Sequence, residues 1–266
     1  MNVASDVRLC RVDDDPKSIS AVANTITLAF ANDPLIKWLR PLAPVWTSDQ
    51  ADTYRWQYRR VRRAIAEGIV LQSESVPEEY QQSLLPTGSR SNSTAALGSH
   101  TSGDDRGLSN GDRDAETAVL LFPPKSRRKW TLSRRVLIVK LWLLDMFDPV
   151  AEKGTSPQRL ETMMTTHERS TARIKTQYQM QDAWYLEVVA VHPRLQGRAL
   201  GKKVMRSILD VARDEPILLE CTRKSNIGFY RSLGFEVVEE VELADGDEGV
   251  KLWFMLRQTS QQTDAQ

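Results

Sequence analysis

The chain has few residues suited to metal chemistry or to a disulfide framework. Its 266 residues include only two cysteines, Cys10 and Cys221, which are too few for a disulfide scaffold and lack metal-ligand spacing. The three histidines, His100, His167 and His192, are scattered and form no HExxH-type cluster. We therefore expect no metal site.

The chain also lacks a strong excess of charge of either sign. Its 36 Lys and Arg residues balance 35 Asp and Glu residues, and 41% of the chain is hydrophobic. This composition argues against wholesale disorder and against a polyanion-binding protein. The arginines of YRWQYRRVRR (residues 54–63) alternate with apolar residues at roughly helical spacing, which favours a solvated helix face over a nucleic-acid site. We expect no nucleic-acid partner.

Long apolar runs are absent as well. The longest, VLIVKLWLLDMF (136–147), contains Lys140 and Asp145 and is too short to span a bilayer, so we expect a buried helix or a pocket wall. The N-terminal stretch MNVASDVRLCRVDDDPKS has no apolar core flanked by basic residues, and therefore no visible secretory signal. The expectation is a cytoplasmic protein without a membrane partner, with the nucleus left open.

Hydrophobic periodicity predicts strands that alternate with helices and then a β-rich end. Helices are expected at residues 17–39 (stopping near 32–34), 55–68, 156–177, 201–213 and 225–235, and strands at 7–12, 69–73, 117–124, 183–191, 216–222, 236–243 and 250–256. This pattern is typical of an α/β (α+β) fold with a mixed central β-sheet and helices on both faces.

One segment differs sharply from its surroundings. Residues 86–116 are rich in Ser, Gly, Asn and Asp, and Leu97 and Leu108 are their only large aliphatic residues. Such a segment buries too little apolar surface to order itself. We therefore predict a disordered insertion within a single domain of residues 1–260, followed by a flexible tail at 261–266.

The polar turn HPRLQGRALG (192–201) joins the apolar run YLEVVAVH to a helix-like segment. A helix N-terminus favours an anion, so the junction suits a phosphate group. A dinucleotide fingerprint requires GxGxxG, whereas the glycines here are only Gly197 and Gly201. A P-loop requires GxxxxGK[ST], but the spacing is one residue short and Lys203 replaces the magnesium-binding Ser or Thr.

A third pattern, [QR]-x-x-G-x-[GA], fits Gln196 to Gly201 with one departure, because Ala199 replaces the central glycine. Residues 184–243, which include WYLEVVAVHPRLQGRALG and NIGFYRSLGFEVVEEVEL, resemble the core of the GCN5-related N-acetyltransferase (GNAT) superfamily in order and spacing. LLECT…N…FYRSLGF is nearest to the puromycin N-acetyltransferase-like branch. Residues 73–180 match only loosely, and substrate choice would reside there.

The resemblance implies a GNAT fold with a splayed strand pair and acetyl-CoA as co-substrate, without a metal. It implies direct attack of a small-molecule primary amine on the thioester in a ternary complex, by a monomer or a homodimer. The expected cofactor-binding residues are those of the strand, the pyrophosphate loop and the closing helix, namely Val189, Ala190, Val191, Gln196, Gly197, Arg198, Ala199, Leu200, Gly201, Lys202, Asn226 and Tyr230. Asn226 would bind the pantetheine arm, or alternatively it or Ser225 would cap the helix.

The same resemblance places Tyr230 near the sulfur as the general acid, with ring packing under the sheet as its alternative role. The base is Glu220, Glu187, or water or another residue. By the period of two, Glu187 shares a strand face with Tyr185, Val189 and Val191. His192 is interpreted as a structural loop residue. A catalytically weak acyl-CoA-binding regulatory protein and a protein or peptide N-acetyltransferase remain the alternative functions.

Overall fold

The computed structural model describes residues 7–41, 50–73, 114–128, 130–147, 154–213 and 215–258. Within these residues, one seven-stranded sheet has the order β1-β2-β3-β4-β5-β7-β6. The strands are β1 Leu9–Arg11, β2 Ile69–Ser73, β3 Thr117–Phe122, β4 Trp184–Val191, β5 Ile217–Cys221, β6 Glu236–Asp245 and β7 Glu248–Arg257. β4 and β5 are parallel, and every other neighbouring pair is antiparallel.

The described helices are α1 Pro16–Ala29, α2 Pro34–Leu39, α3 Gln50–Glu67, α5 Leu132–Phe147, α6 Pro157–Gln177, α7 Leu200–Ala212 and α8 Lys224–Arg231, with short 3-10 turns η3 Lys125–Arg127 and η4 Pro193–Leu195. Three of them begin in the same way. Asp15, Asp33 and Ser156 cap α1, α2 and α6, and each cap is followed by a proline, whose missing N–H costs nothing in the first turn. Helix α1 therefore ends at Ala29, earlier than predicted, and a separate helix, α2, begins at the Asp33-Pro34 pair.

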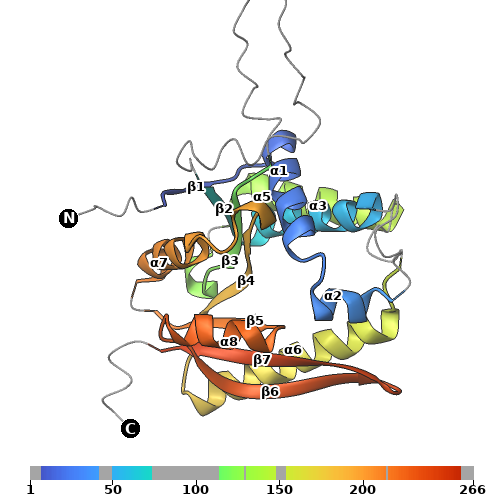
Figure 1. Cartoon of the computed structure of the whole chain (residues 1–266). Helices are drawn as coiled ribbons and strands as arrows, with labels where there is room; N and C mark the ends of the chain where they lie inside the picture. The colour runs from blue at the N-terminus through green and yellow to red at the C-terminus, as the bar shows by residue number, and fades with distance from the viewer. Residues whose placement is uncertain are drawn as a thin grey trace, which may run out of the picture.

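Helices cover both faces of the sheet (Figure 1). On one face, α1, α3 and α5 pack over Val70, Ala118, Leu120, Val188 and Ala190. On the same side, α6 packs over the C-terminal strands through a cluster that contains Ile174, Leu218 and Phe254. The opposite face is covered by α7, whose buried residues join those of β3, β4, β5 and β7. The predicted fold class is confirmed.

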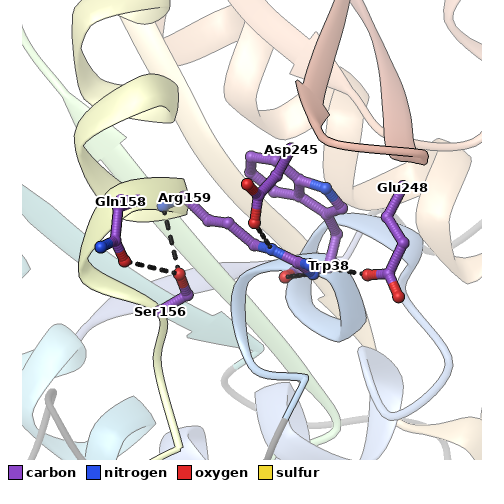
Figure 2. A network of polar contacts seen from close by, with 6 residues as sticks. All are labelled: Trp38, Ser156, Gln158, Arg159, Asp245 and Glu248. Carbon is purple, nitrogen blue, oxygen red and sulfur yellow. Dashed lines mark hydrogen bonds and ion pairs between the residues drawn. The ribbon is translucent and has the colours of Figure 1, made fainter.

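Arg159, near the start of α6, joins three elements at one end of the molecule (Figure 2). Its guanidinium donates to the carbonyl oxygen of Trp38 at 2.8 Å, to Asp245 at 2.7 Å and to Glu248 at 2.7 Å. Trp38 lies in α2, and the two acids lie at the tip of the β6–β7 hairpin. The contact fixes α2 and α6 against the C-terminal hairpin.

The apolar segment at 136–147 is a helix, as expected, but the prediction that it is buried is wrong. Only Leu137 and Leu141 of α5 are buried, whereas Trp142 is 64% exposed and Phe147 80% exposed. No described helix is both long enough and apolar enough to cross a bilayer.

The predicted insertion and tail fall largely outside the described residues. Residues 86–113 and 261–266 lie there, so their predicted disorder stays a prediction, as does the single-domain boundary at 260. Residues 114–116 are described and pack on the fold. Ala115 is 8% exposed, and Asp114 accepts a hydrogen bond from Asn24 at 2.5 Å.

Candidate active site

The sheet opens between its two parallel strands. β4 and β5 pair only through Trp184–Leu186 and Ile217–Leu219, although β4 continues to Val191 and β5 to Cys221. The far edge of β4 is fully occupied by β3. The main-chain groups of β4 beyond Leu186 therefore face a gap, as the predicted splayed strand pair requires.

A β-bulge lies where the two strands part. Leu120 of β3 pairs with Val188, and the next residue, Leu121, pairs with Leu186, so Glu187 is the extra residue. A bulge reverses the alternation of side chains along a strand. For this reason the prediction that Tyr185 shares a face with Val189 and Val191 is wrong.

The two sides of the bulge contact different layers. Tyr185 contacts His167 of α6, whereas Val189 and Val191 pack on the cluster that includes α7. The strand therefore presents Tyr185 to one helix layer and its last residues to the other.

The glycine-containing loop between β4 and α7 has two residues in the left-handed region of backbone conformation. Gly197 has φ +77°, and Ala199, the N-cap of α7, has φ +59° and ψ +7°. The side chain of Gln196 donates to the carbonyl oxygen of Val191 at 3.0 Å, which ties the loop to the end of β4. Ala199 thus holds the left-handed conformation that a glycine adopts without strain.

A cavity of about 1120 Å³ lies along the gap. Of the twelve predicted cofactor-binding residues, eleven line it and Arg198 does not. The lining continues past the loop to Glu187, Glu220 and the side chains of α6. Within the described residues, no three His, Cys, Asp or Glu side chains form a group that would hold a metal.

Glu220, near the end of β5, lies in a cluster of polar and aromatic groups in this cavity. Its carboxylate contacts Nδ1 of His167, and the hydroxyl of Tyr185 donates to the same oxygen at 3.4 Å. The rings of His167 and Tyr185 meet edge to face, with centroids 5.2 Å apart. The hydrogen bond to Glu220 raises the pKa of His167, and burial followed by the Glu220 charge raises that of Tyr185.

Glu187 has a different partner. Nε of Arg60, from α3, donates to its carboxylate at 2.7 Å. The Arg60 guanidinium also lies 5.7 Å from the ring centroid of Trp56, and Trp56 lines the cavity. The two candidate bases therefore differ in environment, because Glu187 is held by a permanent cation and Glu220 by groups that titrate.

Tyr230, on α8, lines the cavity and packs against aromatic rings. Its ring centroid lies 5.2 Å from that of Phe229 and 6.0 Å from that of Phe235. Burial, the larger cause, and the nearby Cys221 raise the pKa of the Tyr230 hydroxyl. The hydroxyl is therefore neutral at physiological pH, and Tyr230 both packs against aromatic rings and lines the cavity.

Asn226 and His192 also have defined places. Asn226 lies within α8 and lines the cavity, and the N-cap is Arg223, so the alternative that Asn226 or Ser225 caps the helix is wrong. His192 caps η4, accepts from the Arg194 N–H at 3.3 Å and contacts Asp114 at 3.2 Å. It is 3% exposed, which agrees with its interpretation as a structural residue.

Sequence reasoning missed His167 and Arg60. Both lie on helices far from the glycine loop in sequence, and no motif marks them. A signal exists for His167, because Met163, Met164, His167 and Thr171 recur at helical spacing and all four line the cavity. Arg60 lies in the arginine-rich segment that was interpreted as a solvated face.

Residues 170–235 match the family model described as "Acetyltransferase (GNAT) family". The fold is that of the GNAT acetyltransferases. The family match covers about a quarter of the chain, and the fold extends the likeness to these enzymes over the rest of the described residues. The matched segment contains β4, the loop, α7, β5 and α8.

Solved GNAT structures cover nearly the whole chain at low sequence identity. Arylalkylamine N-acetyltransferase 2 from Aedes aegypti has a TM-score of 0.54 and 12% identity, over 94% of this chain and 98% of its own. A Corynebacterium glutamicum protein described as "histone acetyltransferase HPA2 and related acetyltransferase" has a TM-score of 0.52 and 14% identity, over 96% of this chain and 97% of its own. The Drosophila melanogaster polyamine N-acetyltransferase has a TM-score of 0.50 and 12% identity, over 95% of this chain and 100% of its own. These likenesses establish the GNAT fold beyond the matched segment.

Proposed function

We propose that this GNAT protein transfers the acetyl group of acetyl-CoA to the primary amine of a small molecule, by direct attack in a ternary complex. One observation carries the proposal. A single cavity joins the glycine-containing loop at the N-terminus of α7 to the Glu220–His167–Tyr185 cluster. Two structural neighbours are named for their action on arylalkylamines and polyamines, which supports an amine acceptor.

The loop end of the cavity is suited to the pyrophosphate of CoA. The first amides of a helix have no partner within the helix, and its dipole favours an anion. Lys202, which lines the cavity one turn into α7, adds positive charge. The main chain of Val189 to Val191 faces the gap, where it would pair with the pantetheine amides, and Asn226 would bind the same arm. An N–H near Val189 would stabilise the oxyanion.

The other end of the cavity would accept the proton of the amine. In neutral His167 the carboxylate of Glu220 favours the proton on Nδ1, which leaves Nε2 as the acceptor. As the amine nitrogen bonds to the thioester carbon, its proton passes to this pair. Glu187 is the weaker candidate, because it would have to give up its ion pair with Arg60 to accept a proton.

The departing thiolate would receive a proton from Tyr230. Burial keeps this hydroxyl protonated, and it lines the same cavity as the loop. The C–S bond breaks, the sulfur takes the Tyr230 proton, and the net products are the amide and CoA with a free thiol. The Glu220–His167 pair would then release its proton to water, and Tyr230 would take one up. We retain Tyr230 as the general acid and Glu220, with His167, as the base.

The test is release of CoA thiol from acetyl-CoA in the presence of a panel of arylalkyl, polyamine and amino-sugar amines. Wild-type protein should release thiol with at least one amine, and Tyr230→Phe should lower kcat by about 10²–10⁴-fold with little change in CoA binding. CoA binding without turnover on any amine would favour the acyl-CoA-binding alternative. Turnover restricted to peptides would favour the protein acetyltransferase alternative.

The puromycin N-acetyltransferase-like branch remains a prediction within this proposal. It rests on the resemblance of LLECT…N…FYRSLGF (218–235) and of LAFANDPLIKWL (28–39), while residues 73–180 match only loosely. Inclusion of puromycin in the amine panel tests this assignment directly.

A further inference from the structure

Helix α5 carries most of the exposed apolar surface of the described chain. Eleven large hydrophobic side chains are exposed among the described residues, and eight of them lie between residues 130 and 147. These eight are Trp130, Leu132, Val136, Val139, Trp142, Leu143, Met146 and Phe147. Of the other three, Leu160 and Met164 line the cavity. A patch of this kind marks an interaction surface.

The exposed residues lie on one side of the helix. Leu132, Val136, Val139, Leu143 and Met146 follow one another at alternating intervals of four and three, which places them on one face of an α-helix. Leu137 and Leu141, which are buried, anchor the opposite face to the core cluster that contains α1 and α3. The helix is thus attached by one side and open on the other.

The charges around this face have one sign. Residues 130–147, which carry the exposed apolar side chains, contain three Lys and Arg residues, Arg134, Arg135 and Lys140, and a single acid, Asp145. Asp145 turns toward α3, where Arg59 and Arg63 contact its carboxylate at 2.6 and 2.5 Å. Arg135 and Lys140 are exposed and make no ion pair with any described residue. The open face is therefore apolar in its centre and positive at its edges.

This combination disfavours a second copy of the chain as the occupant. In a two-fold contact along α5, Arg135 and Lys140 would meet the same residues of the other copy, and the like charges would repel. A contact between α5 and the acidic β6–β7 hairpin of another copy would be head-to-tail and would not close. A negatively charged bilayer satisfies both features of the face, because it accepts apolar side chains and attracts the flanking cations.

We propose that α5 lies in the plane of an anionic lipid surface and attaches the protein to it peripherally. The apolar stripe enters the boundary between headgroups and acyl chains, with Trp142 at the headgroup level and Arg135 and Lys140 against the lipid phosphates and carboxylates. This replaces the expectation of no membrane partner. The pyrophosphate loop and α7 lie on the other face of the sheet from α5, so a bound surface does not block them (Figure 1).

The test is flotation of the full chain with vesicles of phosphatidylcholine alone and of phosphatidylcholine mixed with phosphatidylserine. Wild-type protein should float with the mixed vesicles at low salt, less at high salt, and weakly with phosphatidylcholine alone. Replacement of both cations, Arg135→Gln with Lys140→Gln, should weaken binding to the mixed vesicles by about fivefold for each charge removed.

The apolar pair Val139→Ser with Trp142→Ser should abolish flotation with both kinds of vesicle. Matched controls on the exposed side of α7, Arg206→Gln and Val211→Ser, should float like wild type. Thermal melting and thiol release of the α5 variants should match wild type, since these side chains are exposed and outside the cavity.

Three outcomes would overturn the proposal. The first is failure of wild-type protein to float with the mixed vesicles. The second is equal flotation of the α5 variants and the wild type. The third is a dimer in sedimentation velocity that the α5 variants dissociate, because this would assign the face to a second copy. None of these outcomes depends on turnover, so the proposal and the proposed activity fail independently.

Discussion

At the scale of single residues, two carboxylates in one cavity are distinguished by their partners. Glu220 contacts His167 and Tyr185, whereas Glu187 forms an ion pair with Arg60. A base must exist in a form that can take up a proton, and a permanent guanidinium opposes that uptake. This difference supports the proposed assignment of the base to Glu220 with His167.

The matched pair Glu220→Gln and Glu187→Gln tests it. Glu220→Gln should lower kcat by about 10²–10⁴-fold, because the amide neither accepts the proton nor fixes the histidine tautomer. The loss of kcat in Glu187→Gln should be at least ten times smaller than the loss in Glu220→Gln. The main effect of Glu187→Gln should be on the position of Arg60. The measurement is steady-state thiol release with the best amine, with CoA binding followed by calorimetry. A larger loss in Glu187→Gln would transfer the base role to Glu187.

The pH dependence tests the same pair through its histidine. The hydrogen bond to Glu220 raises the pKa of His167 above its ordinary value of 6.5. Since the base must be neutral, kcat/KM should rise with pH through a midpoint above 6.5, and Glu220→Gln should move that midpoint downward. A midpoint that Glu220→Gln leaves unchanged would exclude His167 as its origin.

Stability should respond in the opposite direction to activity. A raised folded-state pKa means that the pair stabilises the fold fully below pH 6.5, and that this contribution disappears as pH rises through the raised value. Thermal melting of wild type and of His167→Gln across this range measures the contribution. The two melting temperatures should differ most at acidic pH.

At the scale of elements, Ala199 shows what a loop demands of its sequence. The position requires φ +59°, which costs a residue with a β-carbon about 1–2 kcal/mol, while glycine adds conformational entropy to the unfolded chain. Ala199→Gly should therefore raise the free energy of unfolding by up to about 1 kcal/mol and preserve CoA binding. Denaturant unfolding with and without CoA checks both expectations.

The control for this loop is the opposite change at its other left-handed residue. Gly197 has φ +77°, and a β-carbon there would meet no atom within 4 Å. Gly197→Ala therefore adds backbone strain without a steric clash and should destabilise the protein by up to about 1 kcal/mol, because the lower entropy of the unfolded chain offsets part of the strain. Equal stability of both variants and the wild type would mean that the loop backbone differs from the one described.

Local patterns predicted the elements that depend on neighbouring residues. Strand β4, the loop and α7 were predicted within one or two residues, because apolar alternation and helical spacing are local signals. The bulge at Glu187 was missed, since nothing in YLEVVAV shows which residue will lose its partner on β3. The exposure of α5 was missed because apolar composition indicates a need for burial without naming the layer that provides it.

The candidate site also has one part that could be predicted from the sequence and one part that could not. The residues expected to bind the cofactor lie within positions 189–230, where the resemblance named them, and eleven of the twelve line the cavity. The acceptor side combines α3, α6 and two strands, and His167 reaches Glu220 across 53 positions in sequence. Such contacts arise from tertiary packing, which a single sequence does not encode in any local pattern.

At the scale of the whole molecule, the sheet is nearly two sheets. One half consists of β1, β2, β3 and β4, and the other consists of β5, β7 and β6. The strands of the two halves are joined only by three residue pairs between β4 and β5. Further contacts join the halves, where Thr222 donates to Asp33 and Arg223 to the carbonyl oxygen of Asn32, both at 2.5 Å. These contacts tie the α1–α2 segment to the loop before α8.

Acetyl-CoA would add another connection between the halves. The loop at 196–202 follows the first half, whereas Asn226 and Tyr230 belong to α8 of the second, and all of them line one cavity. A ligand that contacts both halves should stabilise both. At 100 times its Kd, CoA should raise the free energy of unfolding by about 2.7 kcal/mol.

Hydrogen exchange locates that stabilisation. With CoA, protection should increase in the loop, in the free edge of β4 and in α8, and the two halves should lose their remaining protection together. Lys202→Ala should weaken CoA binding and require more ligand for the same protection, whereas Lys203→Ala, whose residue lies outside the cavity, should not. Protection confined to the loop and α7 would mean that CoA contacts one half alone, and α8 with Tyr230 would then lie too far from the thioester to protonate the leaving sulfur.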